Sequence, residues 1–406
     1  MKTKSALGVV AAILIAGIAG AVFLWLRLPQ KIILPDGTKL TLASVTYGKV
    51  HLFSAPKIAR KRVTTAADTL CVWVREEFAG KTHGNFTVFI LDKSGAYCAG
   101  TATVQRFPAG PGADIACFRL AVFPRRDGKL RLQIESNNSQ DETPVAKNEF
   151  VVAFPAQKPS AKWLPQSLPD TQESNDFTVT LTKLVYGVSY TQPKNSSPTD
   201  PTNQAVLAAF RIEQNGVIAT NWQPVRIESW DATGNHSISG THKIQRDGDE
   251  TVMIYKWGLP PDEPAWKLRA EFVRTSGFGP DELWPVAGIP IVTNANPQLP
   301  DDPANAFSQT KVGNSTLLVY PAQRLANGQI SVHVSVDPAP PAPENLYFTL
   351  VEATDENGKK IKSPSRSWGG INFHFNFNAN NAQTINATFA LQGDHFAEFN
   401  VKPEKQ

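Results

Sequence analysis

The segment Thr41-Leu42-Ala43-Ser44-Val45-Thr46-Tyr47-Gly48 has a second copy later in the chain, Thr180-Leu181-Thr182-Lys183-Leu184-Val185-Tyr186-Gly187. The shared residues are Thr-Leu, an aliphatic residue three positions on, and Tyr-Gly at the end, and the offset is 139 residues. A second motif, Asp-x-x-Gly, recurs at the same offset, beginning at Asp92 and at Asp231. Because two separate motifs keep one spacing, the chain contains a duplicated unit.

The Asp-x-x-Gly motif predicts a tight hairpin turn. Asp opens such a turn by accepting a backbone N–H, and Gly adopts the left-handed conformation that lets the next strand return. A third copy begins at Asp355, after a shifted spacing. Four positions before the Asp, the three copies place Val88, Ile227 and Val351, and we expect these side chains to share the core face.

Period-two alternation of apolar and polar residues runs through most of the chain, as in Ile371-Asn-Phe-His-Phe-Asn-Phe377. We therefore expect an all-β protein with three tandem antiparallel β-sandwich domains of immunoglobulin-like type, after one N-terminal transmembrane helix. The predicted organisation is an anchor at 1–30, domains at 31–155, 176–293 and 313–406, and Pro-rich linkers at 156–175 and 294–312.

A family resemblance rests on the run Leu34-Pro35-Asp36-Gly37-Thr38, followed by Thr41-Leu42, Val45-Thr46-Tyr47-Gly48 and His51. Together with an N-terminal apolar segment, this run resembles an uncharacterised bacterial group of membrane-anchored proteins with tandem immunoglobulin-like repeats. The similarity covers about 20 residues closely. It implies a bacterial, extracytoplasmic setting and brings no activity with it.

The apolar segment Ala6 to Leu26 is 21 residues long and carries no charge. As a helix it would span about 31 Å, which matches a bilayer core of roughly 30 Å. Trp25 and Arg27 suit the interface that follows. A cleaved signal peptide is the alternative, since Ala19-Gly20-Ala21 resembles a cleavage site, but cleavage there would leave an apolar mature end.

An N-terminal anchor followed by a long body places the bulk of the chain outside the cytoplasm, in the periplasm or at the cell surface. Small residues recur every four positions on one face of the predicted helix, at Gly8, Ala12, Ala16 and Gly20. Such a face permits close helix packing and a homo-oligomer. Ordinary anchor composition explains it as well.

The three cysteines are Cys71, Cys98 and Cys117, all in the first predicted domain. One disulfide among them and three buried thiols both fit an extracytoplasmic sandwich. No C-x-x-C pair is present, so the pattern indicates neither a zinc site nor a redox site.

No motif indicates catalysis, a metal or a cofactor. The seven His form no close ligand pair, and the sequence contains no nucleophile elbow, P-loop or dinucleotide-binding glycine pattern. The formal net charge of +4 gives no general basis for nucleic-acid binding. We expect neither catalytic nor metal-binding residues, although a hydrolase site assembled from distant positions remains an alternative.

Two sets of residues suggest contacts. Five of the nine Trp lie in the second predicted domain, and Trp222 and Trp257 are the most loop-like, so they are candidates for a ligand surface. Lys57, Arg60, Lys61 and Arg62 are candidates for contact with an anionic surface. For the Trp residues the simpler explanation is packing within the domain, and for the basic residues it is a solvated loop.

We therefore expect a non-enzymatic, membrane-anchored extracytoplasmic protein that binds a protein or cell-envelope partner or has a structural role. A carbohydrate-binding protein that uses the Trp-rich second domain is the alternative.

Overall fold

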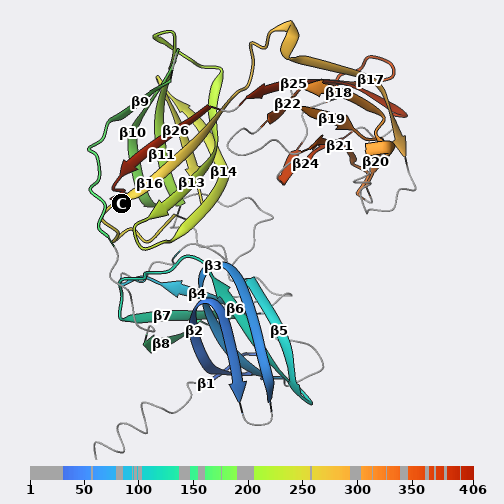
Figure 1. Cartoon of the computed structure of the whole chain (residues 1–406). Coiled ribbons are helices and arrows are strands. Elements are labelled where there is room, and N and C mark those ends of the chain that lie inside the picture. Colours follow the sequence, from blue (N-terminus) through green and yellow to red (C-terminus); the bar gives the residue numbers. More distant parts are fainter. Residues whose placement is uncertain are drawn as a thin grey trace, which may run out of the picture.

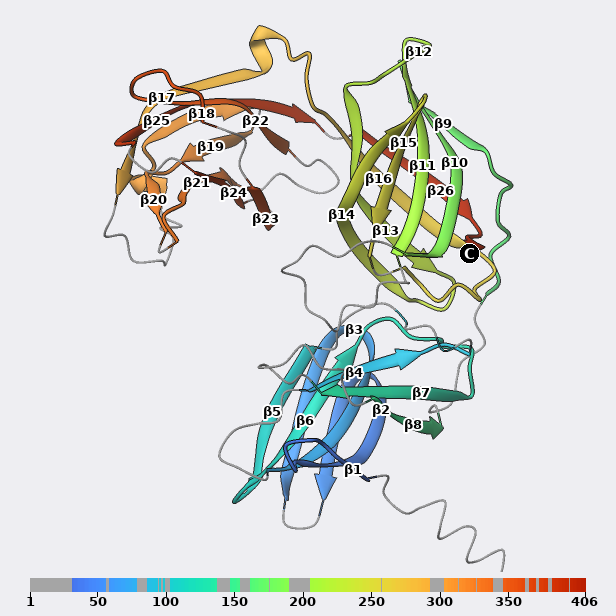
Figure 2. The ribbon, with the colours of Figure 1, turned by 180° about the vertical axis from the view of Figure 1, so that it is seen from behind.

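The computed structural model describes residues 31–55, 58–78, 86–93, 95, 98, 103–136, 147–153, 161–174, 176–189, 205–256, 258–292, 303–312, 314–325, 327–338, 346–361, 365–369, 372–378, 382–393 and 395–406. This part of the chain is all-β, with antiparallel pairing dominant (Figures 1 and 2). None of its helices has the length and apolar character needed to cross a bilayer. The predicted anchor, with Gly8, Ala12, Ala16 and Gly20, lies outside the described residues.

The first unit packs a five-stranded sheet, in the order β1-β2-β3-β6-β5, against the sheet β4-β7-β8. Alternate side chains of each strand enter the core between the sheets, as Leu70, Val72 and Val74 do from β3. The strands are β1 (Lys31–Ile33), β2 (Lys39–Ala55), β3 (Ile58–Glu77), β4 (Phe86–Leu91), β5 (Thr103–Gly110), β6 (Ala113–Leu120), β7 (Lys129–Ser136) and β8 (Lys147–Ala153).

The second unit has its own core between two layers. Strand β14 belongs to both layers, because its first half pairs with β13 and its second half with β15. Such a strand makes a corner between two packed sheets. The strands are β9 (Asp170–Ser174), β10 (Phe177–Val188), β11 (Ala205–Gln214), β12 (Val217–Ile218), β13 (Trp222–Asp231), β14 (His236–Asp247), β15 (Glu250–Tyr255), β16 (Trp266–Arg274), β26 (His395–Val401) and β27 (Glu404–Lys405).

The third unit is an insertion in the second. Among the described residues, its core and the side chains packed against it lie between Trp284 and Leu391, whereas Ala397, Phe399 and Val401 return to the core of the second unit. In Figure 1 the red strands β25 and β26 lead from one unit into the other. Its elements are η1 (Pro280–Glu282), β17 (Leu283–Val292), η2 (Pro303–Asn305), β18 (Ser308–Val312), β19 (Ser315–Val319), β20 (Ala322–Arg324), β21 (Ile330–Asp337), β22 (Leu346–Asp355), β23 (Ser365–Gly369), β24 (Asn372–Phe377) and β25 (Thr384–Gly393).

Strand pairing therefore differs from the predicted boundaries in the second half of the chain. Strand β17 pairs with β25 of the third unit rather than with the second, and β26 pairs with β16 of the second unit rather than with the third. Two more strands lie inside the predicted linkers. Strand β9, in the linker at 156–175, pairs with β10, and β18, in the linker at 294–312, pairs with β19. Alternation predicts a strand but not its partner, which explains the difference.

The Pro-rich segment before β9 is not a free spacer. The backbone N–H of Gln166 donates to Asn400 O at 2.7 Å, and the side chain of Asn400 donates back to Leu164 O at 2.8 Å. Leu168 packs against the core of the second unit. Residues 161–169 therefore run along the side of this unit, from the first unit to β9 (Figure 1).

The predicted turns are confirmed in all three copies. Asp92, Asp231 and Asp355 each accept a backbone hydrogen bond from the Gly three positions on, and each Gly has a positive φ. Val88 and Ile227 are buried as predicted, but Val351 is 47% exposed. The register of β22 against β25 shifts between Leu350 and Glu352, so a bulge turns this one side chain outward.

Candidate functional site

Trp222 is a core residue. Only 4% of its surface is exposed, and its ring lies 4.7 Å from that of Phe177 and 4.9 Å from that of His395. Its indole N–H donates to Gln214 Oε1 at 3.3 Å. The prediction that Trp222 lines a ligand surface is therefore wrong. The sequence around Trp222 is typical of a loop, but Trp222 is the first residue of β13 and its side chain enters the core. Trp257 lies outside the described residues.

The basic run lies on a hairpin that folds back over its own sheet. Pairing of β2 with β3 is interrupted after Gly48, which pairs with Thr69, whereas Val50 pairs with Thr64. Beyond this bend, Phe53 stacks on Trp73 at 5.2 Å, although Trp73 lies in the body of β3. The folded-back tip thus covers the outer face of the five-stranded sheet.

On this hairpin Arg60 and Arg62 are exposed, and Lys61 is half-buried with Nζ 5.7 Å from the ring centre of Phe107. Lys57 lies outside the described residues. The described part of the basic run therefore has two solvent-facing cations and one that packs against the protein.

The cysteines are three buried thiols. Cys71 and Cys117 lie together under the folded hairpin, whereas Cys98 lies in the core between the sheets. The hydrogen bond between Cys71 and Cys117, together with burial, raises the pKa of the Cys117 thiol. Burial, together with the negative charges of Asp92, Asp127 and Asp262, raises the pKa of Cys98 well above its ordinary value. The structure contains no disulfide among these residues. The raised pKa values keep the Cys98 and Cys117 thiols protonated at neutral pH, whereas the hydrogen bond with Cys117 lowers the pKa of Cys71.

A series of buried side-chain hydrogen bonds connects the folded-back hairpin to Thr46 in the repeated segment 41–48. Trp73 donates its indole N–H to Thr46 Oγ1 at 3.0 Å, Thr46 Oγ1 lies 2.9 Å from His51 Nδ1, and His51 Nε2 lies 3.0 Å from Thr69 Oγ1. His51 is fully buried. Both ring nitrogens therefore have neutral hydroxyl partners, which suits an uncharged imidazole.

We expect the protein to lose stability as the pH falls below about 6.5. Burial lowers the pKa of His51 below 6.5, so the unfolded chain takes up its proton first and gains stability relative to the folded chain. The pKa values of His374 and His395 are lowered for the same reason. Urea midpoints measured between about pH 7.5 and pH 5 should fall, and the fall should be smaller in His51→Gln. An identical pH slope in that variant would contradict the assignment.

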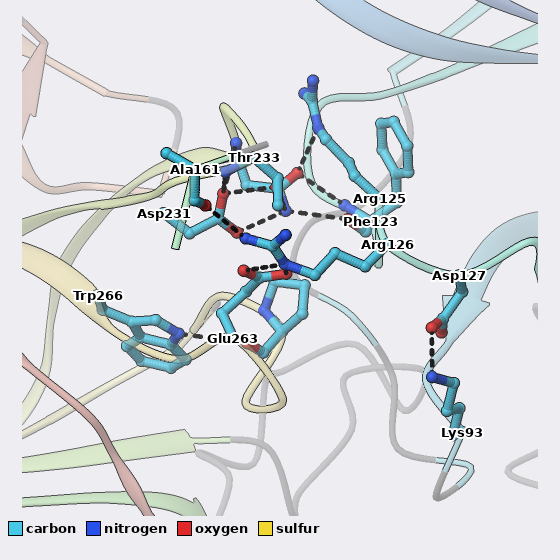
Figure 3. A network of polar contacts seen from close by, with 12 residues as sticks. Lys93, Phe123, Arg125, Arg126, Asp127, Ala161, Asp231, Thr233, Glu263 and Trp266 are labelled. Carbon is cyan, nitrogen blue, oxygen red and sulfur yellow. Dashed lines mark hydrogen bonds and ion pairs between the residues drawn. The ribbon is translucent and has the colours of Figure 1, made fainter. Parts of the chain in front are cut away.

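The first and second units meet through a buried polar network (Figure 3). Arg125 donates Nε–H to Asn235 Oδ1 at 2.9 Å, one terminal NH₂ to Tyr47 OH at 2.8 Å, and the other to the carbonyl of Asp68 at 3.0 Å. Its guanidinium also lies over the ring of Phe123 at 4.6 Å. One side chain thus joins strands β2 and β3 to the second unit.

Asn235 completes this contact from the second unit. Its Oδ1 accepts from Phe123 N–H at 3.2 Å, and its Nδ2 donates to Phe123 O at 2.9 Å and to Asp231 Oδ2 at 2.7 Å. Asp231 is the first residue of the repeated turn, and both it and Asn235 are buried. The repeated turn of the second unit therefore docks on the first unit.

A second ion pair flanks the network. Arg126 Nε lies 2.9 Å from Glu263 Oε2 and 3.1 Å from Oε1, and its terminal NH₂ donates to Ala161 O at 2.8 Å (Figure 3). Burial raises the pKa of Glu263, and the hydrogen bonds from Arg126 oppose that rise. Val122 adds an apolar contact, since it joins the core of the second unit.

A polar groove of about 460 Å³ lies on the second unit. It is formed by the segment 161–169, β9, β16 and β26. Its lining residues are Trp163, Gln166, Gln172, Lys267, Glu398, Phe399 and Asn400. None of these residues was predicted as a site from the sequence, and the one available signal was Trp163, three residues before Gln166 in a Pro-rich segment.

Another groove, in the first unit, is basic in composition but mostly neutralised. Of its cations, Lys93 pairs with Asp127 at 2.6 Å, Arg131 with Glu149 at 2.6 Å, and Arg126 with Glu263. It is therefore a weak candidate for an anion site. Within the described residues no three His, Cys, Asp or Glu side chains are placed to hold a metal ion.

Comparisons with known proteins add little. No family model and no curated protein matches the chain. A solved structure described as the conserved domain protein from Bacillus anthracis is similar to it at 9% identity, over 64% of this chain and 81% of that chain, with a TM-score of 0.22. At this TM-score the likeness supports no statement about fold or function.

Proposed function

We propose that the chain is a non-enzymatic, single-pass membrane protein whose immunoglobulin-like sandwich units lie outside the cytoplasm and bind a protein or cell-envelope partner. The observation that carries the proposal is the position of the buried contact between the first two units, compared with the place where the chain enters the first unit. Lys31 pairs with Thr41, six residues along β2 from Tyr47 at the contact. At about 3.4 Å per residue, this is a separation of about 20 Å.

The entry of the chain and the second unit therefore lie toward opposite ends of the first unit (Figures 1 and 2). With residues 6–26 as an anchor, the first unit would stand next to the bilayer and hold the second unit away from it. Arg60 and Arg62, both exposed, would then lie on the unit nearest the anionic headgroups. A buried contact, rather than a flexible linker, would set the distance between membrane and binding surface.

Topology and fractionation test this proposal. A phosphatase fused after Gln406 should be active, and a cytoplasm-specific reporter at the same place should be silent. The chain should remain with membranes after a high-salt wash, and a chain that starts at Lys31 behind a cleavable signal should not. Cytoplasmic reporter activity, or salt extraction of the full chain, would reject the anchor and its orientation.

A further inference from the structure

We propose that the groove lined by Trp163 binds a neutral oligosaccharide. This goes beyond the proposed function, because an anchored scaffold needs no saccharide site. The groove differs from the ligand surface expected at Trp222, which is buried.

The lining of the groove is suited to hydroxyl groups. Gln166, Gln172 and Asn400 contribute carboxamides, each with a donor and an acceptor group. Among the described residues, neither the indole N–H of Trp163 nor the side chain of Gln166 has a hydrogen-bond partner, and Asn400 Oδ1 is buried without one. Pyranose hydroxyls both donate and accept, so they match such a set.

Trp163 supplies the apolar element that a saccharide needs. Its side chain is half-buried, so part of the indole ring is open to the groove. The C–H face of a pyranose ring can pack on an aromatic face while the hydroxyls reach the surrounding polar groups. The segment that carries Trp163 is held in place, since Leu164 and Gln166, which follow Trp163, both hydrogen-bond to Asn400.

Charge favours a neutral ligand. The two charged side chains of the groove, Lys267 and Glu398, pair with each other at 2.7 Å. Their charges cancel, so the groove offers no net attraction to an anionic polymer. The pair can still accept and donate hydrogen bonds at its free positions.

A peptide strand is the other class of ligand to consider, because β26 is an outer strand of its sheet. Strand addition needs a row of unpaired backbone groups. At the groove, however, Gln166 N–H already donates to Asn400 O, and Gln166 forms a parallel bridge with Val401. The edge is closed at that point, so recognition in this groove must use side chains.

The test uses the full chain, purified in detergent, against neutral gluco-, manno- and chito-oligosaccharides of about four to six units. Calorimetry should detect saturable binding of at least one series. Trp163→Ala should weaken that binding at least about tenfold, and Trp163→Phe should keep most of it. Gln172→Ala, which removes the carboxamide together with its long 3.4 Å bond to Asp170 Oδ1, should weaken binding about threefold or more, by the loss of a hydrogen bond to the saccharide.

Phe307→Ala is the matched control, because this aromatic residue is 42% exposed, bonds through its backbone to Val319 of the third unit, and does not line the groove. It should bind as the wild type does, and all variants should keep the wild-type melting temperature. The proposal is overturned if no series binds, if Trp163→Ala binds as well as the wild type, or if raising salt from about 0.05 to 0.5 M abolishes binding. Binding of extended peptides alone would assign the groove to the other class.

Discussion

A chain that ends at Gly393 is expected to lose the fold of its second unit, although the residues removed lie more than a hundred positions from most of that unit. Strand β26 pairs along its whole length with β16, from His395 opposite Phe272 to Val401 opposite Trp266. Its inward side chains Ala397, Phe399 and Val401 are at most 4% exposed. Without them Trp266, which is fully buried, would face solvent.

The magnitude follows from the buried area. Full burial of a Phe or Val side chain contributes roughly 1.5–3 kcal/mol. Removing Phe399 and Val401, and exposing the side chains that they cover, should therefore lower the free energy of unfolding by about 5 kcal/mol or more. Domains as a whole are stable by about 5–15 kcal/mol. Loss of the strand should therefore unfold the second unit or leave it marginal, while the third unit, with its separate core, stays folded.

The measurement is limited proteolysis with mass spectrometry. In the shortened chain, a fragment from about residue 280 to 393 should survive and β10 to β16 should be digested. A chain that ends at Pro403, without β27, is the control and should keep its second unit. Two single substitutions in β26 give a finer comparison. Phe399→Ala, on the buried face, should lower the free energy of unfolding by about 3–5 kcal/mol, whereas Phe396→Ala, on the opposite face, should not. Equal resistance of the shortened and full chains would contradict the assignment of β26.

The chain leaves the second unit after β16 and returns to it through β26, and hydrogen bonds join these two connections. The side chain of Gln392 accepts from Arg274 N–H at 2.8 Å and donates to Arg274 O at 2.7 Å. This pair of bonds imitates one step of a β-ladder between the outgoing and the returning chain. These bonds hold the outgoing and the returning chain together, so both connections between the second and third units lie at one place.

Local chemistry made part of this fold predictable. The Asp-x-x-Gly turns require only an acceptor side chain and a residue with positive φ, and all three form as expected. The alternating strand around Phe373, Phe375 and Phe377 buries all three rings. The prediction failed at Val351 because a bulge depends on the pairing strand, which the local pattern does not contain.

The candidate sites were less predictable because they are non-local. The groove combines Trp163 from a segment predicted as a spacer with Asn400 from a strand predicted for another domain. Trp222, in contrast, looked exposed because of its neighbours in sequence, yet Phe177 and His395 enclose it. Residue type marked these positions as candidates, and only the pairing of distant strands decided which of them faces solvent.

The contact between the first two units yields the second large expected effect. Asn235→Ala should weaken this contact by about 3 kcal/mol or more, because it removes five hydrogen bonds of a fully buried side chain, three of them to the first unit. Arg125 Nε–H and both backbone groups of Phe123 would lose a partner, and each buried group left unsatisfied costs about 1–3 kcal/mol. The guanidinium keeps its bonds to Tyr47 and Asp68, so the first unit should remain folded.

The third copy of the turn supplies a matched control for this change. Lys359 stands four residues after Asp355, as Asn235 stands four after Asp231, but its side chain is exposed. Its two bonds to Asp355 use the backbone alone: its N–H donates to Asp355 Oδ1, and its carbonyl accepts from Asp355 N–H. Lys359→Ala should therefore leave stability within about 0.5 kcal/mol of the wild type. In Asn235→Ala we expect proteolytic cleavage of residues 161–169 to speed up and scattering to show a wider spread of inter-unit distances. If Asn235→Ala behaved as the wild type does in both measurements, this buried contact would not be what holds the first two units together.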